Sequence, residues 1–307
     1  MTVELPVELV REIVELVARD WQFGDLAWVA SLSLVCRAVQ CWVHPILYHT
    51  VVIDQAQHAI FFDLIANKPS SFFSPMRHLT LLGSSSFPAM DLGRLLSCIN
   101  ARPVDVLTLD TMGLDTLCQA QATARSTQAS FRPRGLFMLS HVSGKQWAQH
   151  AYALQHLTHL RLIEGTDWIA ACESLPALSH ICIETSSHWH GGPTGLDDFA
   201  WTMRRVLQFP KCVRVVVRFD ISRLGIVETK QELWDGMRNA LGALRDERMY
   251  LYSVREDERI AYERPRREWL RVCARESRAG VDPWNCGGRV YSIGDRDRAD
   301  SDSNTET

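Results

Sequence analysis

The hexapeptides MRHLTL (76–81), VDVLTL (104–109) and LTHLRL (157–162) share one pattern, with apolar residues at the first, fourth and sixth positions. Alternation of apolar and polar residues over such a segment is typical of a β-strand with one buried face. The pattern recurs at Leu178/Ile181/Ile183 and, in weaker form, at Arg134/Phe137/Leu139, Cys212/Val215/Val217 and Asp246/Met249/Leu251. We therefore expect seven short strands between residues 76 and 251.

Helical stretches are expected between these strands, and the candidates are residues 91–100, 145–153, 197–208 and 231–245. Successive copies of the strand pattern are 21 to 34 residues apart. Repeats of this length, each a strand plus a helix or turn, are typical of leucine-rich-repeat-like solenoids, whose units bury their apolar faces only by stacking. The prediction is an α/β fold in which residues 51–290 form an irregular leucine-rich-repeat-like solenoid with a parallel sheet.

A doubly wound α/β domain has the same alternation of strands and helices. Such a domain would bind its ligand at a glycine-rich first turn, and the nearest candidate is Gly83-Ser84-Ser85-Ser86. That stretch has neither the G-x-G-x-x-G spacing nor the G-K-[ST] ending of a phosphate-binding loop. The solenoid is therefore preferred, and the doubly wound enzyme or ligand-binding domain stays open as an alternative.

Residues 1–50 are expected to form a separate module of three short helices. The first begins at Pro6, which suits the first position of a helix, and Asp25 is a plausible cap for the second. The third is expected to end at Pro45. The apolar residues of the three helices are, in order, Leu9, Ile13, Leu16 and Val17; Leu26, Val29, Ala30 and Leu34; and Val35, Val39, Trp42 and Val43.

The segments LPVELVREIVELV (5–17) and SLSLVCRAVQCWVHPILYHTVVI (31–53) resemble an F-box, especially as it occurs at the start of fungal F-box proteins. This resemblance implies that the helices dock a Skp-type adaptor and, through it, a cullin complex. The apolar helical surface agrees with helix-in-groove recognition. The residues implied to bind the adaptor are Leu5, Pro6, Glu8, Leu9, Ile13, Leu34, Val35, Cys36, Arg37, Trp42 and Leu47. Alternatively, the helices only cap the domain that follows.

The predicted function is therefore substrate recruitment to an SCF-type (Skp–cullin–F-box) ubiquitin ligase, with an unidentified protein substrate on the repeat region. In that role the chain is a non-catalytic adaptor, because transfer chemistry belongs to other subunits. Two rival hypotheses remain: a protein-interaction scaffold outside any ligase, and the doubly wound domain described above.

Composition narrows the other possibilities. The chain has 307 residues, 46% of them hydrophobic and 22% charged, with a formal net charge of −3. That charge argues against a nucleic-acid partner, and no apolar run reaches the roughly 18 residues that a membrane span needs. Nine scattered cysteines without a Cys-x-x-Cys pair are typical of reduced thiols, so a cytoplasmic or nuclear location is expected.

No residue pattern marks a reaction centre or a cofactor site. A zinc site built from Cys172, Cys182, His188 and His190 would have only one closely spaced pair of ligands, and no Gly-x-Ser-x-Gly motif is present. We therefore expect neither a metal nor a cofactor. The acidic segment 291–307 is expected to be a disordered tail, because it contains almost no apolar residues.

Overall fold

The computed structural model describes residues 5–22, 25–82, 95, 104–124, 132–163, 167–186, 193–220, 227–254, 284 and 287–290. These residues form two compact units, which divide between Leu139 and Ser140. The predicted helix at 91–100 (except Leu95), the histidines at 188 and 190, the glycine-rich turn at 83–86 and the acidic tail lie outside the described residues.

The first unit begins with three helices, which are α1 (Val7–Trp21), α2 (Leu26–Leu32) and α3 (Arg37–Leu47). Pro6 is the residue before α1 rather than its first residue. The predicted cap of α2 is confirmed, since a carboxylate oxygen of Asp25 accepts a hydrogen bond of 2.9 Å from the backbone N–H of Trp28.

The prediction that Pro45 interrupts the third helix is wrong. The helix α3 continues through Pro45 to Leu47. A proline lacks the N–H that would bond to the carbonyl four residues back, and its ring crowds that carbonyl. The helix nevertheless continues, since Val43 and Ile46 on either side of the proline are buried and the N–H of Tyr48 donates to the carbonyl of His44 at 3.2 Å. A second difference concerns Leu34, which lies in the turn after α2 and not on the helix.

The rest of the first unit is a parallel sheet of four strands with helices between them. The strands are β1 (Thr50–Ile53), β2 (His78–Leu81), β3 (Val106–Leu109) and β4 (Gly135–Met138). They pair in chain order, with Leu79 beside Leu107 and Leu107 beside Leu136. The intervening helices are α4 (His58–Asn67), the short 3₁₀ helix η1 (Ser70–Phe73) and α6 (Thr111–Ala124).

The strand predicted around Phe137 is confirmed, but its register is shifted by one residue. The residue paired with Leu107 is Leu136, and Met138 pairs with Leu109, so Phe137 and Leu139 do not occupy the predicted positions. All four residues of β4 are buried, and a strand buried on both faces has no alternation that could fix its register.

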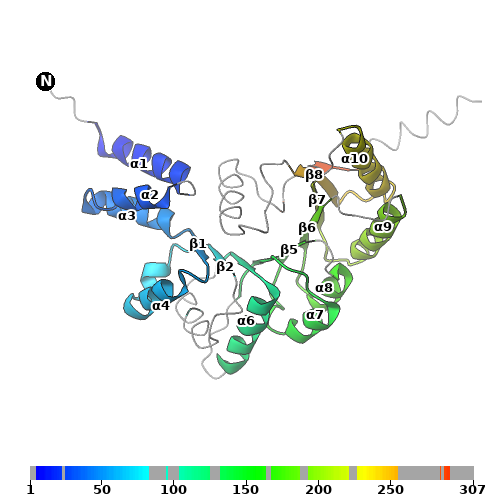
Figure 1. Cartoon of the computed structure of the whole chain (residues 1–307), viewed down its shortest axis with the longest axis horizontal. Coiled ribbons are helices and arrows are strands. Elements are labelled where there is room, and N and C mark those ends of the chain that lie inside the picture. Colours follow the sequence, from blue (N-terminus) through cyan, green and yellow to red (C-terminus); the bar gives the residue numbers. More distant parts are fainter. Residues whose placement is uncertain are drawn as a thin grey trace, which may run out of the picture. The chain divides into compact units, whose positions relative to one another are not determined.

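The second unit contains five strands in chain order. They are β5 (His159–Ile163), β6 (His180–Ser186), β7 (Arg214–Asp220), β8 (Met249–Val254) and β9 (Gly288–Arg289). Neighbours from β5 to β8 are parallel, whereas β9 pairs with β8 in the antiparallel sense. The helices are α7 (Gly144–His150), α8 (Trp168–Ser174), α9 (Pro193–Leu207) and α10 (Val227–Gly242), and these four lie on one side of the strands (Figure 1).

The register of this sheet creates one apolar face and one mixed face. Two rows of buried side chains cross the apolar face, namely Leu160, Ile181, Val215 and Met249, followed by Leu162, Ile183, Val217 and Leu251. These are the fourth and sixth positions of the predicted hexapeptides, so the pattern identified both the strands and their buried face. On the opposite face the rows contain His159, Arg161, Glu184 and Arg218.

The predicted α/β class is thus confirmed, and so are the helices expected at 145–153, 197–208 and 231–245, with ends shifted by a few residues. Within each unit the strands follow one another without the reversal of order that marks a doubly wound sheet. None of the described helices is long and apolar enough to cross a lipid bilayer.

Candidate functional site

The helical module, which we define as residues 5–47, has a small hydrophobic core of its own. Five buried residues form it: Ala18, Val29, Val39, Val43 and Ile46. The partly buried side chains of Val14, Leu32, Trp42 and Leu47 pack against this core. Each helix contributes to the core, so the module has the internal packing that a stable presentation of side chains requires.

The first helix of the module has three distinct faces. Val14 and Ala18 face the core. Glu15 lies on a polar face, where it forms ion pairs with Arg11 at 2.7 Å and with Arg19 at 3.0 Å. The third face carries Leu9, Ile13 and Leu16, which are spaced like one helical stripe and are 46–59% exposed. The exposed stripe of Leu9, Ile13 and Leu16 is therefore separate from the face with Val14 and Ala18, which packs against the core.

The turn between α2 and α3 adds further apolar surface. Leu34 is 85% exposed, and Val35 beside it is also exposed. Among the described residues, ten of the fifteen exposed large hydrophobic side chains lie in the first 35 positions. A soluble monomer rarely concentrates apolar surface in this way, and such concentrations mark interaction sites.

The structure divides the predicted adaptor-binding residues into two groups. Nine of them are exposed, namely Leu5, Pro6, Glu8, Leu9, Ile13, Leu34, Val35, Cys36 and Arg37. The other two, Trp42 and Leu47, pack against the core of the helical module. Their contribution to any docking surface is therefore indirect, through the position of α3.

Sequence reasoning did not select an aromatic pair on the same module. The rings of Trp21 and Trp28 lie 6.0 Å apart, and both side chains are exposed, as is Leu26 beside them. The available signal was the number of apolar residues in α1 and α2, which exceeds what one buried face per helix can hold. Large exposed aromatic side chains are frequent anchors in protein interfaces.

The second unit contains a buried cluster of charged side chains. Arg161 and Arg218 are each only 2% exposed, and they come from β5 and β7, on either side of Glu184 in β6. The Nε and Nη2 atoms of Arg161 both lie 2.6 Å from Oε1 of Glu184, and Nε of Arg218 lies 3.1 Å from the same oxygen. The cluster links three neighbouring strands, so its evident role is structural.

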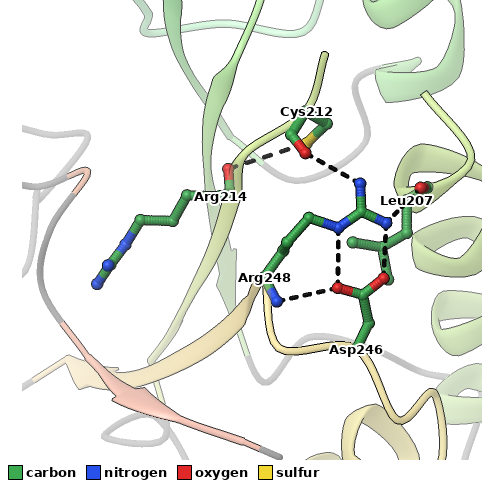
Figure 2. A network of polar contacts seen from close by, with 5 residues as sticks. All are labelled: Leu207, Cys212, Arg214, Asp246 and Arg248. Carbon is green, nitrogen blue, oxygen red and sulfur yellow. Dashed lines mark hydrogen bonds and ion pairs between the residues drawn. The ribbon is translucent and has the colours of Figure 1, made fainter. Parts of the chain in front are cut away.

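A third network fastens the end of α9 to the strands that follow it (Figure 2). The guanidinium of Arg248 donates to both carboxylate oxygens of Asp246, at 2.9 and 2.6 Å. It also donates to the backbone carbonyls of Leu207 at 2.6 Å and Cys212 at 2.9 Å. The hydrogen bonds from Arg248 hold the pKa of Asp246 below its ordinary value, so both partners are charged at neutral pH. We refer to these contacts as the Arg248 clamp.

Three thiols among the described residues have perturbed acidity, and of these Cys172 and Cys212 are buried and Cys118 is partly buried. Burial raises the pKa of Cys118 to about 12 and that of Cys212 to about 11, and burial also raises the pKa of Cys172. These three side chains are therefore protonated at neutral pH, which is unlike a thiolate nucleophile. Among the described residues, no group of histidines, cysteines and carboxylates is arranged to hold a metal ion.

Comparison with protein-family models, with curated proteins and with solved structures gives no match to this chain. Among the described residues, the exposed apolar surface of the helical module is the feature that most clearly indicates a binding role.

Proposed function

We propose that the chain is the substrate-recruiting subunit of an SCF-type ubiquitin ligase. In this proposal the helical module docks a Skp-type adaptor, and the strand–helix units form an irregular leucine-rich-repeat-like solenoid that holds a protein substrate. The single observation that carries the proposal is the exposed stripe Leu9, Ile13 and Leu16 on a helix that already buries a different face.

The stripe supports docking because its exposure has no structural benefit within the described part of the chain. Covering a side chain such as Leu or Ile is worth about 1.5–3 kcal/mol, and a partner groove could cover three of them at once. Leu34 and Val35 add apolar area on the same module. The resemblance of residues 5–17 and 31–53 to an F-box names the partner class that such a surface would take.

The solenoid part of the proposal is supported by how the strands succeed one another. Equivalent positions are 28 and 29 residues apart in the first unit, from Leu79 through Leu107 to Leu136. They are 21, 34 and 34 residues apart in the second unit, through Ile181 and Val215. Strands that pair only with their neighbours in sequence, with helices on one side, are what stacked repeats produce.

The proposed chemistry is recruitment alone. A subunit that holds an adaptor at one end and a substrate at the other raises the effective concentration of the substrate near the ubiquitin-loaded enzyme. No side chain of this chain needs to react, so the only requirements are two binding surfaces and a rigid connection within each unit.

The test is complex formation between the purified chain and a recombinant fungal Skp-type adaptor, measured by calorimetry and gel filtration. Replacing Leu9 and Ile13 by aspartate should weaken binding by at least about 30-fold, because two apolar anchors are replaced by charges. A matched control is Ile60→Asp in α4, which places the same charge at an apolar position that is 74% exposed outside the module.

The control should bind like the unaltered chain, and circular dichroism should show unchanged helix content in all variants. If the unaltered chain forms no complex, or if the double variant binds as well as Ile60→Asp, the ligase function is wrong. In that case an interaction scaffold without an adaptor becomes the better description.

A further inference from the structure

A surface cavity of about 680 Å³ lies in the second unit, between α9 and α10. The two helices approach closely at one end, where a Cβ added to Gly236 would lie 3.1 Å from a methyl carbon of Leu196. The wall of the cavity includes Ala200 on α9, Ala240 on α10 and Ala243 in the turn just after α10. Small side chains at these positions leave space between the helices, and we call this space the alanine groove.

Trp201 lines the alanine groove and is 55% exposed. The core-facing residues of α9 are Phe199, Met203 and Val206, all essentially buried, so the helix does not need Trp201 for its packing. The guanidinium of Arg205 lies 5.3 Å from the centre of the Trp201 ring, a cation–π contact that orients the indole. An oriented, exposed tryptophan beside an apolar groove is the kind of residue that dominates binding energy in interfaces.

Charged residues of opposite sign line the groove. Asp197 and Asp198 lie near the start of α9 and are exposed, and Arg204 lies two turns later on the same helix and is also exposed. The step of seven positions along the helix from Asp197 to Arg204 corresponds to about 10 Å. An extended peptide covers that distance with about three residues.

We propose that the alanine groove binds a short peptide segment of a partner protein. The segment has a basic residue at one end, apolar side chains in the middle and an acidic residue about three positions from the basic one. The basic residue pairs with Asp197 and Asp198, the acidic residue pairs with Arg204, and the apolar side chains lie against Trp201. The cavity volume is within the roughly 300–1,000 Å³ range of binding pockets for small ligands.

This site is independent of adaptor docking, because all of its residues belong to the second unit. A chain that fails to bind the adaptor could still bind such a peptide, and the reverse also holds. The two proposals therefore succeed or fail separately.

The test uses three fluorescein-labelled hexapeptides, two of which have two leucines at the centre. The first has arginine before and glutamate after the leucines, the second has glutamate on both sides, and the third is the first with serines in place of the leucines. Fluorescence polarisation should give the first peptide a dissociation constant of about 10–100 µM, and the other two should bind at least about tenfold more weakly.

Two variants connect the binding to the groove. Asp197→Lys combined with Asp198→Lys should reverse the preference, so that the peptide with two glutamates binds better than the first peptide, which a loss of folding cannot imitate. Ala243→Trp, in the turn after α10, should fill the groove and abolish binding. Asn239→Trp, which is exposed on α10 and is not among the residues that line the groove, should leave binding intact.

Two results would overturn the proposal. One is that no peptide binds at concentrations up to about 1 mM, or that the double lysine variant keeps the original preference. The other is that sedimentation shows a dimer of this chain that Ala243→Trp dissociates, because the groove would then be occupied by a second copy.

Discussion

Replacing Arg248 by alanine should destabilise the second unit by about 2–4 kcal/mol. The guanidinium makes four hydrogen bonds, two with the carboxylate of Asp246 and two with the carbonyls of Leu207 and Cys212. Hydrogen bonds to charged groups are worth about 1.5–3 kcal/mol each when they are buried. The side chains of Arg248 and Asp246 are 31% and 22% exposed, so water replaces part of what is lost, and the estimate is lower than the full sum.

The assay is urea unfolding followed by circular dichroism, combined with hydrogen exchange measured on peptides that cover residues 207–216. The midpoint should fall without a change in the slope, since the amount of surface exposed on unfolding stays the same. Amides in that segment should exchange about 30-fold to several hundred-fold faster, because the clamp joins the end of α9 to the start of β7.

The matched control is Arg289→Ala. Arg289 forms an ion pair of 3.6 Å with Glu247 and donates a hydrogen bond of 3.3 Å to the hydroxyl of Tyr250. Because these contacts are exposed to solvent, the loss of Arg289 should lower the stability much less than the loss of Arg248 does. Equal stabilities of the Arg248→Ala and Arg289→Ala variants would show that the Arg248 clamp does not stabilise the unit. Arg248→Lys should lie between the unaltered chain and Arg248→Ala, because lysine keeps the charge but cannot reach both oxygens and both carbonyls.

Three further changes test other parts of the structure. Glu184→Gln should lower the free energy of unfolding in urea by about 2–4 kcal/mol, because it leaves the buried charges of Arg161 and Arg218 without their shared carboxylate. A decrease of less than about 0.5 kcal/mol would contradict this reasoning. Gly287→Ala should loosen β9 and lower the free energy of unfolding by about 1 kcal/mol or more. The reason is that the glycine has φ +89° and an added Cβ would lie 2.9 Å from the carbonyl oxygen of Leu251. An unchanged rate of hydrogen exchange at the Val290 amide would refute this. Burial lowers the pKa of His44, so on acidification the unfolded chain takes up a proton at a higher pH than the folded chain does. The contribution of His44 to stability is therefore complete above about pH 6.5 and falls as the pH decreases. In unfolding measured between about pH 7 and 5, His44→Phe should flatten that decline.

The strands could be predicted because apolar and polar residue types alternate along several of them, although the residues on both faces are largely buried. Leu79 and Leu81 on β2, and Leu107 and Leu109 on β3, flank the polar residues Thr80 and Thr108, which are buried as well. In β4 the alternation disappears, since Gly135–Met138 include no polar side chain, and the register was accordingly predicted one residue out.

In the helical module, the sequence pattern could not predict which face of α1 is buried. The spacing of Leu9, Ile13 and Leu16 predicts a stripe, but spacing alone does not say whether a stripe faces a core or solvent. Val14 and Ala18 form a second apolar face on the same helix, and only the packing of α1 against the other two helices decides which face is buried.

Features that depend on pairing between distant residues were beyond sequence reasoning altogether. The cluster of Arg161, Glu184 and Arg218 needs the registers of three strands, and the alanine groove needs the offset between α9 and α10. Neither arrangement leaves a local pattern, because each partner alone is an ordinary strand or helix residue.

The short strand β9 has a practical consequence for handling the protein. A parallel strand at the border of a sheet presents a row of backbone donors and acceptors to which another chain can add, and this is a common route to aggregation. Here Gly288 and Arg289 occupy those groups on β8, and the N–H of Val290 donates to the carbonyl of Met249 at 3.1 Å. A shortened version of the chain prepared for laboratory work should therefore retain residues 287–290, since their removal would leave β8 as an unpaired edge strand.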